Sequence, residues 1–220
     1  MRSFDEIFEI AAARHGGAAA LEATFPTPKT PQDLADLPED RWLSRFTRSI
    51  FEAGFNWKVI AAKWDGFEEA FDGFDLGKCA FMDDEKFDQL LSNTAIVRNG
   101  KKIATVRENA SFLLSLREQG GAGKVLGGWP STDYIGLLDL LKKEGAHLGG
   151  ASASYALRFL EKDSFILSQD VTARLTAEGV IDKPATSKTA LKAVQAAFNT
   201  WMDQSGRGLS QISRTLAMSV

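Results

Sequence analysis

The sequence predicts a nearly all-helical protein, and three observations support this fold class. Apolar residues recur at spacings of three and four along most of the 220 residues. No segment alternates apolar and polar residues in the way that a half-buried strand does. Hydrophobic residues make up 44% of the chain and include 15 Phe and 5 Trp, which is enough apolar volume for a real core. The length suits one large domain or two tightly packed lobes.

The first 39 residues are expected to form a helix followed by an arm. Ser3 and Glu6 have the spacing of a capping box, which predicts that the first helix starts there. Residues 24–39 contain four prolines and predict an extended arm. We therefore expect an N-terminal helix and proline-rich arm over 1–39, and a helical domain over 40–220.

The rest of the chain is predicted to be a series of short amphipathic helices. In the first of them, Trp42, Phe46 and Ile50 are spaced by four, and Gly54 interrupts the pattern. Asn56 is in a position to cap the next helix. The predicted helices cover about residues 40–53, 57–61, 66–71, 83–91, 99–118, 132–144, 151–160, 169–178, 187–204 and 209–217.

A tight turn between two helices, at residues 145–152, is the clearest local feature. One helix ends at Gly145, and Gly149 and Gly150 allow a sharp turn directly before the next helix. The backbone amides at the start of that helix point outward with the positive end of its dipole, which suits a phosphate oxygen. Lys143 adds positive charge nearby. The alternative is a plain helix–helix turn, which is common in helical bundles.

Composition limits the other classes of function. The net charge of -3 gives no global support for nucleic-acid binding, so a DNA-binding face has to be a local basic patch. Cys79 is the one cysteine, which excludes an intrachain disulfide and a zinc site built on several thiolates. His15 and His147 are too far apart to predict a metal pair. Without a membrane-length apolar run or a signal-peptide pattern, we expect a cytoplasmic monomer that needs no cofactor.

Several linked motifs indicate a more specific class. They are Ala53-Gly54-Phe55-Asn56-Trp57, then Phe71 and Phe74-Asp75, then Ile96-Val97-Arg98-Asn99, Lys102-Ile103 and Asn109-Ala110, and last the turn segment 142–160. In this order and spacing, residues from about 40 to 171 resemble the 3-methyladenine DNA glycosylase I family of the helix-hairpin-helix superfamily. The resemblance implies two helical lobes around a cleft. It also implies an enzyme that flips an alkylated base out of double-stranded DNA and hydrolyses its N-glycosidic bond.

The resemblance also implies roles for individual residues. Trp57 matches the aromatic residue that lines the base pocket, and Phe55 is placed to stack or to wedge; the alternative for both is burial in the core. Arg98 and Lys102 match a basic run that neutralises phosphates, and the alternative is a basic cap at a helix start. The expected DNA-binding residues are Arg98, Lys102, Lys143, Gly149, Gly150 and Ser152.

The chain departs from the family at its acidic and zinc-binding positions. The family places a base-reading glutamate eight residues before the tryptophan, where this chain has Ser49. Glu52 lies about one helical turn further on, so it either reaches a base edge or is a surface acid at a helix end. Asp170 stands where the family has a zinc-binding histidine, and the N-terminal ligands are missing, so we expect no metal.

A candidate for the catalytic carboxylate comes from the resemblance to the wider helix-hairpin-helix superfamily. Other helix-hairpin-helix glycosylases carry a catalytic aspartate soon after the hairpin helix, and Asp170 or Ser168 occupies that place. The alternative for Asp170 is a solvated helix-capping residue. Lyase relatives use a hairpin lysine, and Ser154 stands there, so a lyase activity is not expected.

The predicted function is therefore a monofunctional DNA glycosylase for 3-methyladenine-type bases, with Glu52 and Asp170 as the catalytic candidates and Ser49, Phe55 and Trp57 around the base. One alternative is a non-catalytic DNA- or lesion-binding protein with the same fold, which the missing acid and zinc ligands favour. Another is a helical interaction domain with no role on DNA, which the acidic net charge favours.

Overall fold

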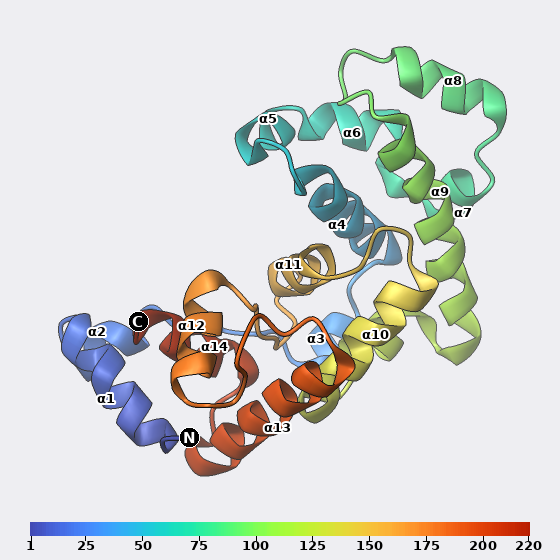
Figure 1. Ribbon diagram of the computed structural model, residues 1–220. Helices are drawn as coiled ribbons and strands as arrows, with labels where there is room; N and C mark the ends of the chain where they lie inside the picture. The colour runs from blue at the N-terminus through green and yellow to red at the C-terminus, as the bar shows by residue number, and fades with distance from the viewer. The chain divides into compact units, whose positions relative to one another are not determined.

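The computed structural model describes residues 1–220 and contains α-helices and short helical turns but no strand (Figure 1). This confirms the predicted fold class. The chain folds into two compact units, here called the terminal unit and the central unit. The terminal unit comprises residues 1–29, 130–136 and 161–220, and the central unit comprises residues 30–129 and 137–160.

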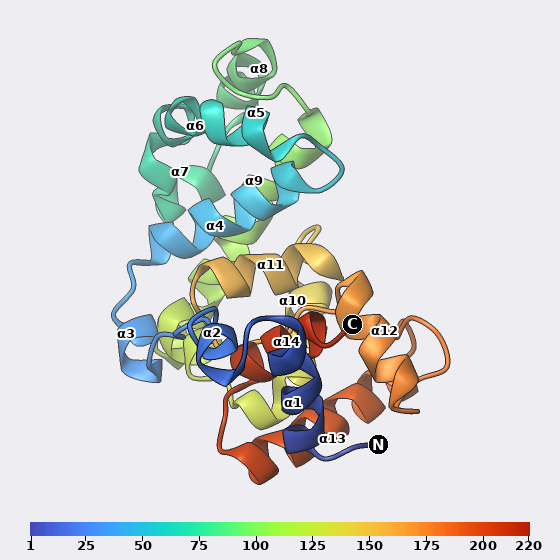
Figure 2. The same cartoon turned by 90° about the vertical axis from the view of Figure 1, so that its left-hand side faces the viewer.

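The terminal unit joins the two ends of the chain. Its helices are α1 (Phe4–Arg14), α2 (Ala18–Glu22), α12 (Gln169–Ala177), α13 (Lys188–Ser205) and α14 (Leu209–Met218). The last helix, α14, packs against α1, α12 and α13, so the first and last segments lie side by side (Figure 2). The predicted capping box at Ser3 and Glu6 is present at the start of α1.

The central unit is built around one amphipathic helix, α4 (Glu39–Glu52), which packs against α9 (Gly100–Ser115) on one side and α11 (Ala151–Phe159) on the other (Figure 1). The predicted apolar stripe of Trp42, Phe46 and Ile50 is fully buried in this packing. The other helices of this unit are α3 (Pro31–Ala35), α5 (Trp57–Ala62), α6 (Trp64–Ala70), α7 (Leu76–Ala80), α8 (Asp84–Ser92) and most of α10 (Tyr134–Glu144).

The proline-rich arm contains a helix that its composition does not suggest. Thr30 and Asp33 form a capping box around Pro31, which occupies the first turn of α3. This helix packs on residues 123–127, where the absence of a side chain at Gly123 lets the backbone of Leu34 approach closely. The arm is therefore divided between the two units near residue 30 instead of forming one extension up to residue 39.

Two other short helices, α2 and α7, were also not predicted, because five residues are too few to show a helical period. No helix in the structure combines the length and the apolarity needed to cross a lipid bilayer.

Candidate functional site

The candidate site begins at the sharp corner between α4 and α5. Helix α4 ends at Glu52, and Gly54 takes a φ of 68°, a left-handed conformation that glycine adopts without strain. The side chain of Asn56 then accepts a hydrogen bond from the backbone N–H of Lys58 and caps α5, as its position in the sequence predicts. This corner places Trp57 at the first position of α5.

Trp57 lies on the surface of the central unit together with two aromatic side chains of α11. Its indole is 44% exposed and contacts the rings of Tyr155 and Phe159 edge-on, at centroid distances of 5.4 and 6.1 Å. Phe159 is itself 50% exposed. We call Trp57, Tyr155 and Phe159 the aromatic group. The alternative of a core tryptophan is wrong for Trp57, and Phe55, at 46% exposed, is not a core residue either.

A cluster of charged residues on α4 adjoins the aromatic group. The guanidinium carbon of Arg45 lies 4.5 Å from the ring centroid of Phe159. The same guanidinium donates hydrogen bonds to Ser49 Oγ at 2.8 and 3.2 Å and to Glu52 Oε2 at 2.6 Å. The other carboxylate oxygen of Glu52 accepts a hydrogen bond from Arg48 Nε at 3.0 Å. Both oxygens of Glu52 are thus bound to arginines.

The cluster is largely buried, and this burial changes the pKa of Arg45. Ser49 and Glu52 are buried, at 3% and 5% exposed. Partial burial lowers the pKa of Arg45 from its ordinary value, although the charge of Glu52 acts in the opposite direction. The alternative of Glu52 as a surface acid at a helix end is wrong, because the carboxylate is enclosed between two cations. A direct catalytic role for Glu52 stays a prediction.

The glycine turn before α11 is open to solvent at the positions that the sequence predicts to bind phosphate. Gly149, Gly150 and the following Ala151 are exposed, whereas Leu148 is fully buried and anchors the turn. Gly150 precedes α11 with a φ of 58°, and no side chain caps the helix there. The first amide groups of α11 are therefore available to an external acceptor. Ser152 is half-buried in the same first turn.

A buried side chain of α9 holds this turn in place. Asn109 is fully buried, and its amide pairs with the backbone of Ala146 in both directions: Nδ2 donates to the carbonyl at 3.0 Å, and Oδ1 accepts from the N–H at 2.8 Å. Asn109 belongs to the Asn109-Ala110 motif, but nothing in the sequence indicates that it contacts the turn.

The three predicted DNA-binding cations have different surroundings. Arg98 is exposed and forms no ion pair. Lys143 is also exposed and pairs with Glu144, whose hydrogen bond raises the pKa of the lysine. Lys102 instead donates to the backbone carbonyls of Phe51 and Ala53 at 3.2 and 2.7 Å, so its ammonium caps the end of α4. Partial burial lowers the pKa of Lys102.

Asp170 belongs to the terminal unit. It is exposed in the first turn of α12, whose cap is Ser168: the Ser168 hydroxyl accepts the hydrogen bond from the backbone N–H of Val171. The side chain of Asp170 is therefore not the capping group of this helix. Its catalytic role stays a prediction.

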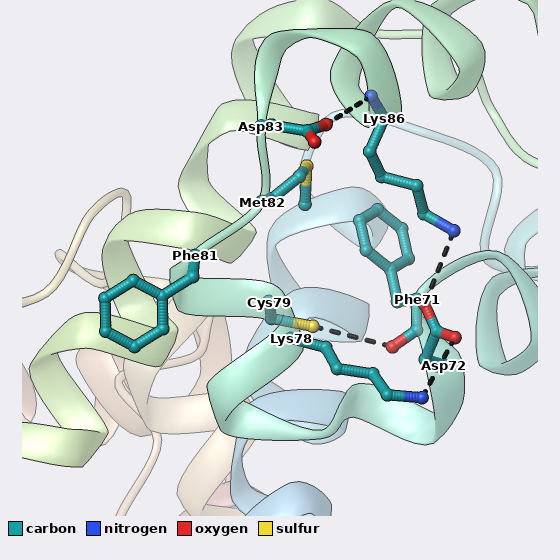
Figure 3. Close-up of a pocket in the computed structure, with 8 residues that line it drawn as sticks. All are labelled: Phe71, Asp72, Lys78, Cys79, Phe81, Met82, Asp83 and Lys86. Atoms are coloured by element: carbon teal, nitrogen blue, oxygen red, sulfur yellow. Dashed lines mark hydrogen bonds and ion pairs between the residues drawn. The ribbon is translucent and has the colours of Figure 1, made fainter.

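A separate pocket of about 240 Å³ in the central unit surrounds Cys79 (Figure 3). Cys79 is buried, its thiol donates to the backbone carbonyl of Phe71, and burial raises its pKa to about 12. Lys78 and Lys86, which also line the pocket, both pair with Asp72. The polar groups of this pocket satisfy one another, so it offers no chemistry of its own.

Three residues of the site escaped the sequence analysis: Arg45, Tyr155 and Phe159. Tyr155 and Phe159 lie within the quoted turn segment, and their spacing of four places them on one face of a helix. Arg45 lies seven residues before Glu52 and four before Ser49, so a helical projection of α4 puts all three on one face.

Comparison with known proteins gives the following matches. Residues 39–126 match the family model described as methyladenine glycosylase. A 3-methyladenine DNA glycosylase I from Staphylococcus aureus is 22% identical with a TM-score of 0.49, and the match covers 64% of this chain and 81% of that one. A variant of 3-methyladenine DNA glycosylase I in complex with 3-methyladenine is 20% identical with a TM-score of 0.49, covering 66% of this chain and 84% of that one. The matched segment, residues 39–126, contains Trp57, Arg98 and Asn109, so the similarity to methyladenine glycosylases covers this part of the central unit.

Proposed function

We propose that this chain is a monofunctional DNA glycosylase that acts as a monomer on double-stranded DNA and excises N3-alkylated purines of the 3-methyladenine type. The observation that carries the proposal is the half-exposed indole of Trp57, which lies within the family segment and contacts two rings of the helix that follows the glycine turn. Exposed aromatic rings that contact one another can stack on a flat ligand such as a nucleobase.

The aromatic group suits an alkylated base. Alkylation at a ring nitrogen makes the purine cationic, and a cation is attracted to the face of an indole or phenyl ring. Such a base leaves readily, because it takes the electron pair of the glycosidic bond and departs neutral. A water molecule then adds to C1′ of the sugar and loses a proton to solvent or to a carboxylate. Catalysis of this step needs positioning and shape more than a strong acid.

The DNA backbone is proposed to bind at the glycine turn. The amides that follow Gly149 and Gly150 would donate to a phosphate oxygen, with Ser152 as a further hydroxyl donor. Lys143 and Arg98 would add electrostatic attraction. Asp170 is proposed as the carboxylate that stabilises the oxocarbenium-like sugar.

The test is the release of free base from double-stranded DNA treated with dimethyl sulfate. Trp57→Ala should lower the rate of release at least tenfold, the order of effect expected when a stacked base loses about 1–3 kcal/mol. Binding to undamaged duplex should change little, because backbone contacts dominate it. Phe81→Ala is the matched control, since Phe81 is 85% exposed in the same unit and lies apart from the aromatic group. Normal base release by Trp57→Ala overturns the pocket assignment.

One observation favours a second candidate function, a non-catalytic lesion-binding protein. The family's base-reading glutamate is replaced by Ser49, and the nearest carboxylate, that of Glu52, is bound to two arginines. Such a protein would bind duplex DNA with a steep dependence on salt concentration yet release no base. A helical interaction domain would show neither property.

A further inference from the structure

We propose that Arg45 reads the base edge and gives the enzyme a preference for N3-alkylated guanine over the corresponding adenine. The inference rests on the proposed glycosylase function and specifies its substrate. It depends on which hydrogen-bonding groups the central unit presents beside the aromatic group.

The charged cluster on α4 offers a base little access to an acceptor, because Ser49 and Glu52 are only 3% and 5% exposed. Glu52 is the carboxylate of the cluster, and each of its oxygens accepts a hydrogen bond from an arginine, at 2.6 Å from Arg45 and 3.0 Å from Arg48. Ser49 Oγ already accepts two N–H groups of Arg45. Two guanidinium groups and one carboxylate leave a local net charge of +1. An accessible carboxylate would favour the exocyclic amino group of adenine, but the carboxylate of Glu52 is buried between two arginines.

Donors, in contrast, are available around the aromatic group. Arg45 uses Nε and Nη2 for its contacts with Ser49 and Glu52, and Nη1 has no hydrogen-bond partner within the chain. The indole N–H of Trp57 and the hydroxyl of Tyr155 also have none. The guanidinium is held against the face of Phe159 at 4.5 Å, and Phe159 contacts both Trp57 and Tyr155. A base stacked on this group meets N–H donors at its edge.

Guanine and adenine differ in what they present to such donors. On the edge that faces the major groove in duplex DNA, guanine offers two acceptors, O6 and N7. On the same edge adenine offers N7 beside an amino group, which is itself a donor. Arginine is the side chain that most often pairs with the guanine edge. With adenine, the amino group would face Nη1 of Arg45 donor to donor. Since Glu52 and Ser49 fix the guanidinium, Arg45 has little freedom to turn away.

The experiment measures the release of 3-methylguanine and 3-methyladenine from duplex DNA treated with dimethyl sulfate. The two bases are separated by chromatography, and each rate is divided by the amount of that lesion in the DNA. We expect the wild-type chain to release 3-methylguanine faster. Arg45→Gln should lower the ratio of the two rates about tenfold, within the discrimination that one arginine–base contact gives.

Two further variants make the test specific. Arg107→Gln is the matched control: Arg107 lies in the same unit but binds the backbone carbonyl of Met82 and the carboxylate of Asp84, so the ratio should stay at its wild-type value. Arg45→Lys keeps a cation beside Glu52 and thus protects the fold. It loses the paired N–H donors of the planar guanidinium, so it should also lower the ratio of 3-methylguanine to 3-methyladenine release. Circular dichroism checks that each variant is folded.

The outcomes separate this inference from the proposed function. Faster release of 3-methyladenine by the wild-type chain overturns the assigned preference but leaves the glycosylase function in place. An Arg45→Lys protein that is folded and keeps the wild-type ratio overturns the role of Arg45. If the wild-type chain releases neither base, the proposed function itself fails, and the preference fails with it.

Discussion

The contact between Asn109 and the glycine turn gives a prediction whose size follows from the structure. Asn109→Ala removes two hydrogen bonds to Ala146, of 3.0 and 2.8 Å, from a fully buried side chain. It leaves one N–H and one carbonyl of the turn without their partner. Each lost hydrogen bond costs about 1–1.5 kcal/mol, so we expect the free energy of unfolding to fall by about 2–3 kcal/mol. For a chain of this length that corresponds to a fall in Tm of roughly 4–12 °C.

The assay is urea and thermal unfolding followed by circular dichroism, with Asn93→Ala as the matched control. Asn93 lies in the same unit and also binds one backbone N–H, that of Ala95 at 2.8 Å, but it is half-exposed and should cost about 0.5–1 kcal/mol. Because Asn109 positions the glycine turn, its variant should also bind duplex DNA more weakly at low salt. A loss of stability no larger than that of the control would refute the reasoning.

Three other predictions concern single residues. Arg98→Ala should reduce the slope of log affinity for duplex DNA against log salt concentration by about 0.9. Lys102→Met should leave that slope unchanged. It should instead lower the free energy of unfolding by about 1.5–3 kcal/mol, because the ammonium group of Lys102 caps two backbone carbonyls. A reduced slope for Lys102→Met would show that it contacts phosphate after all. Burial opposes the ionisation of Glu178, but hydrogen bonds from two arginines outweigh it and hold its pKa below the ordinary 4.5. Glu178→Gln should therefore be less stable than wild type at neutral pH, with a difference that shrinks as the pH falls below about 4.5 in urea titrations; a constant difference would contradict this. Cys79, with a pKa of about 12, should resist iodoacetamide at mildly alkaline pH and react once denatured, as mass spectrometry would show; rapid labelling of the native protein would disprove its burial.

Much of the fold could be predicted because the sequence signals of a helix, its cap and its apolar spacing, lie within a few neighbouring residues. The capping box at Ser3, the cap at Asn56 and the apolar spacing from Trp42 to Ile50 all lie within one or two helical turns. The same holds for the glycine turn, whose exposure and left-handed Gly150 follow from the residue type. Where fewer than two turns are available, as in α2, α3 and α7, no period can be read, and these helices were missed.

The surroundings of the candidate site could not be predicted in the same way. A helical period tells which face of α4 is polar, but it does not tell what lies opposite that face. The neighbours of Trp57 come from α11, far along the chain, and the partner of the glycine turn comes from α9. Both are consequences of how α4, α9 and α11 pack together.

By itself, the sequence determined the helical class, the positions of most helices, the glycine turn before α11 and the resemblance of the segment around Trp57 to methyladenine glycosylases. Only the tertiary structure decided that Glu52 is bound to two arginines, that Lys102 caps a helix end, and that Arg45 adjoins the aromatic group. The physical reason is that a side chain's chemistry is a property of the residue. Its available hydrogen bonds and its charge balance depend instead on which neighbours long-range packing brings to it.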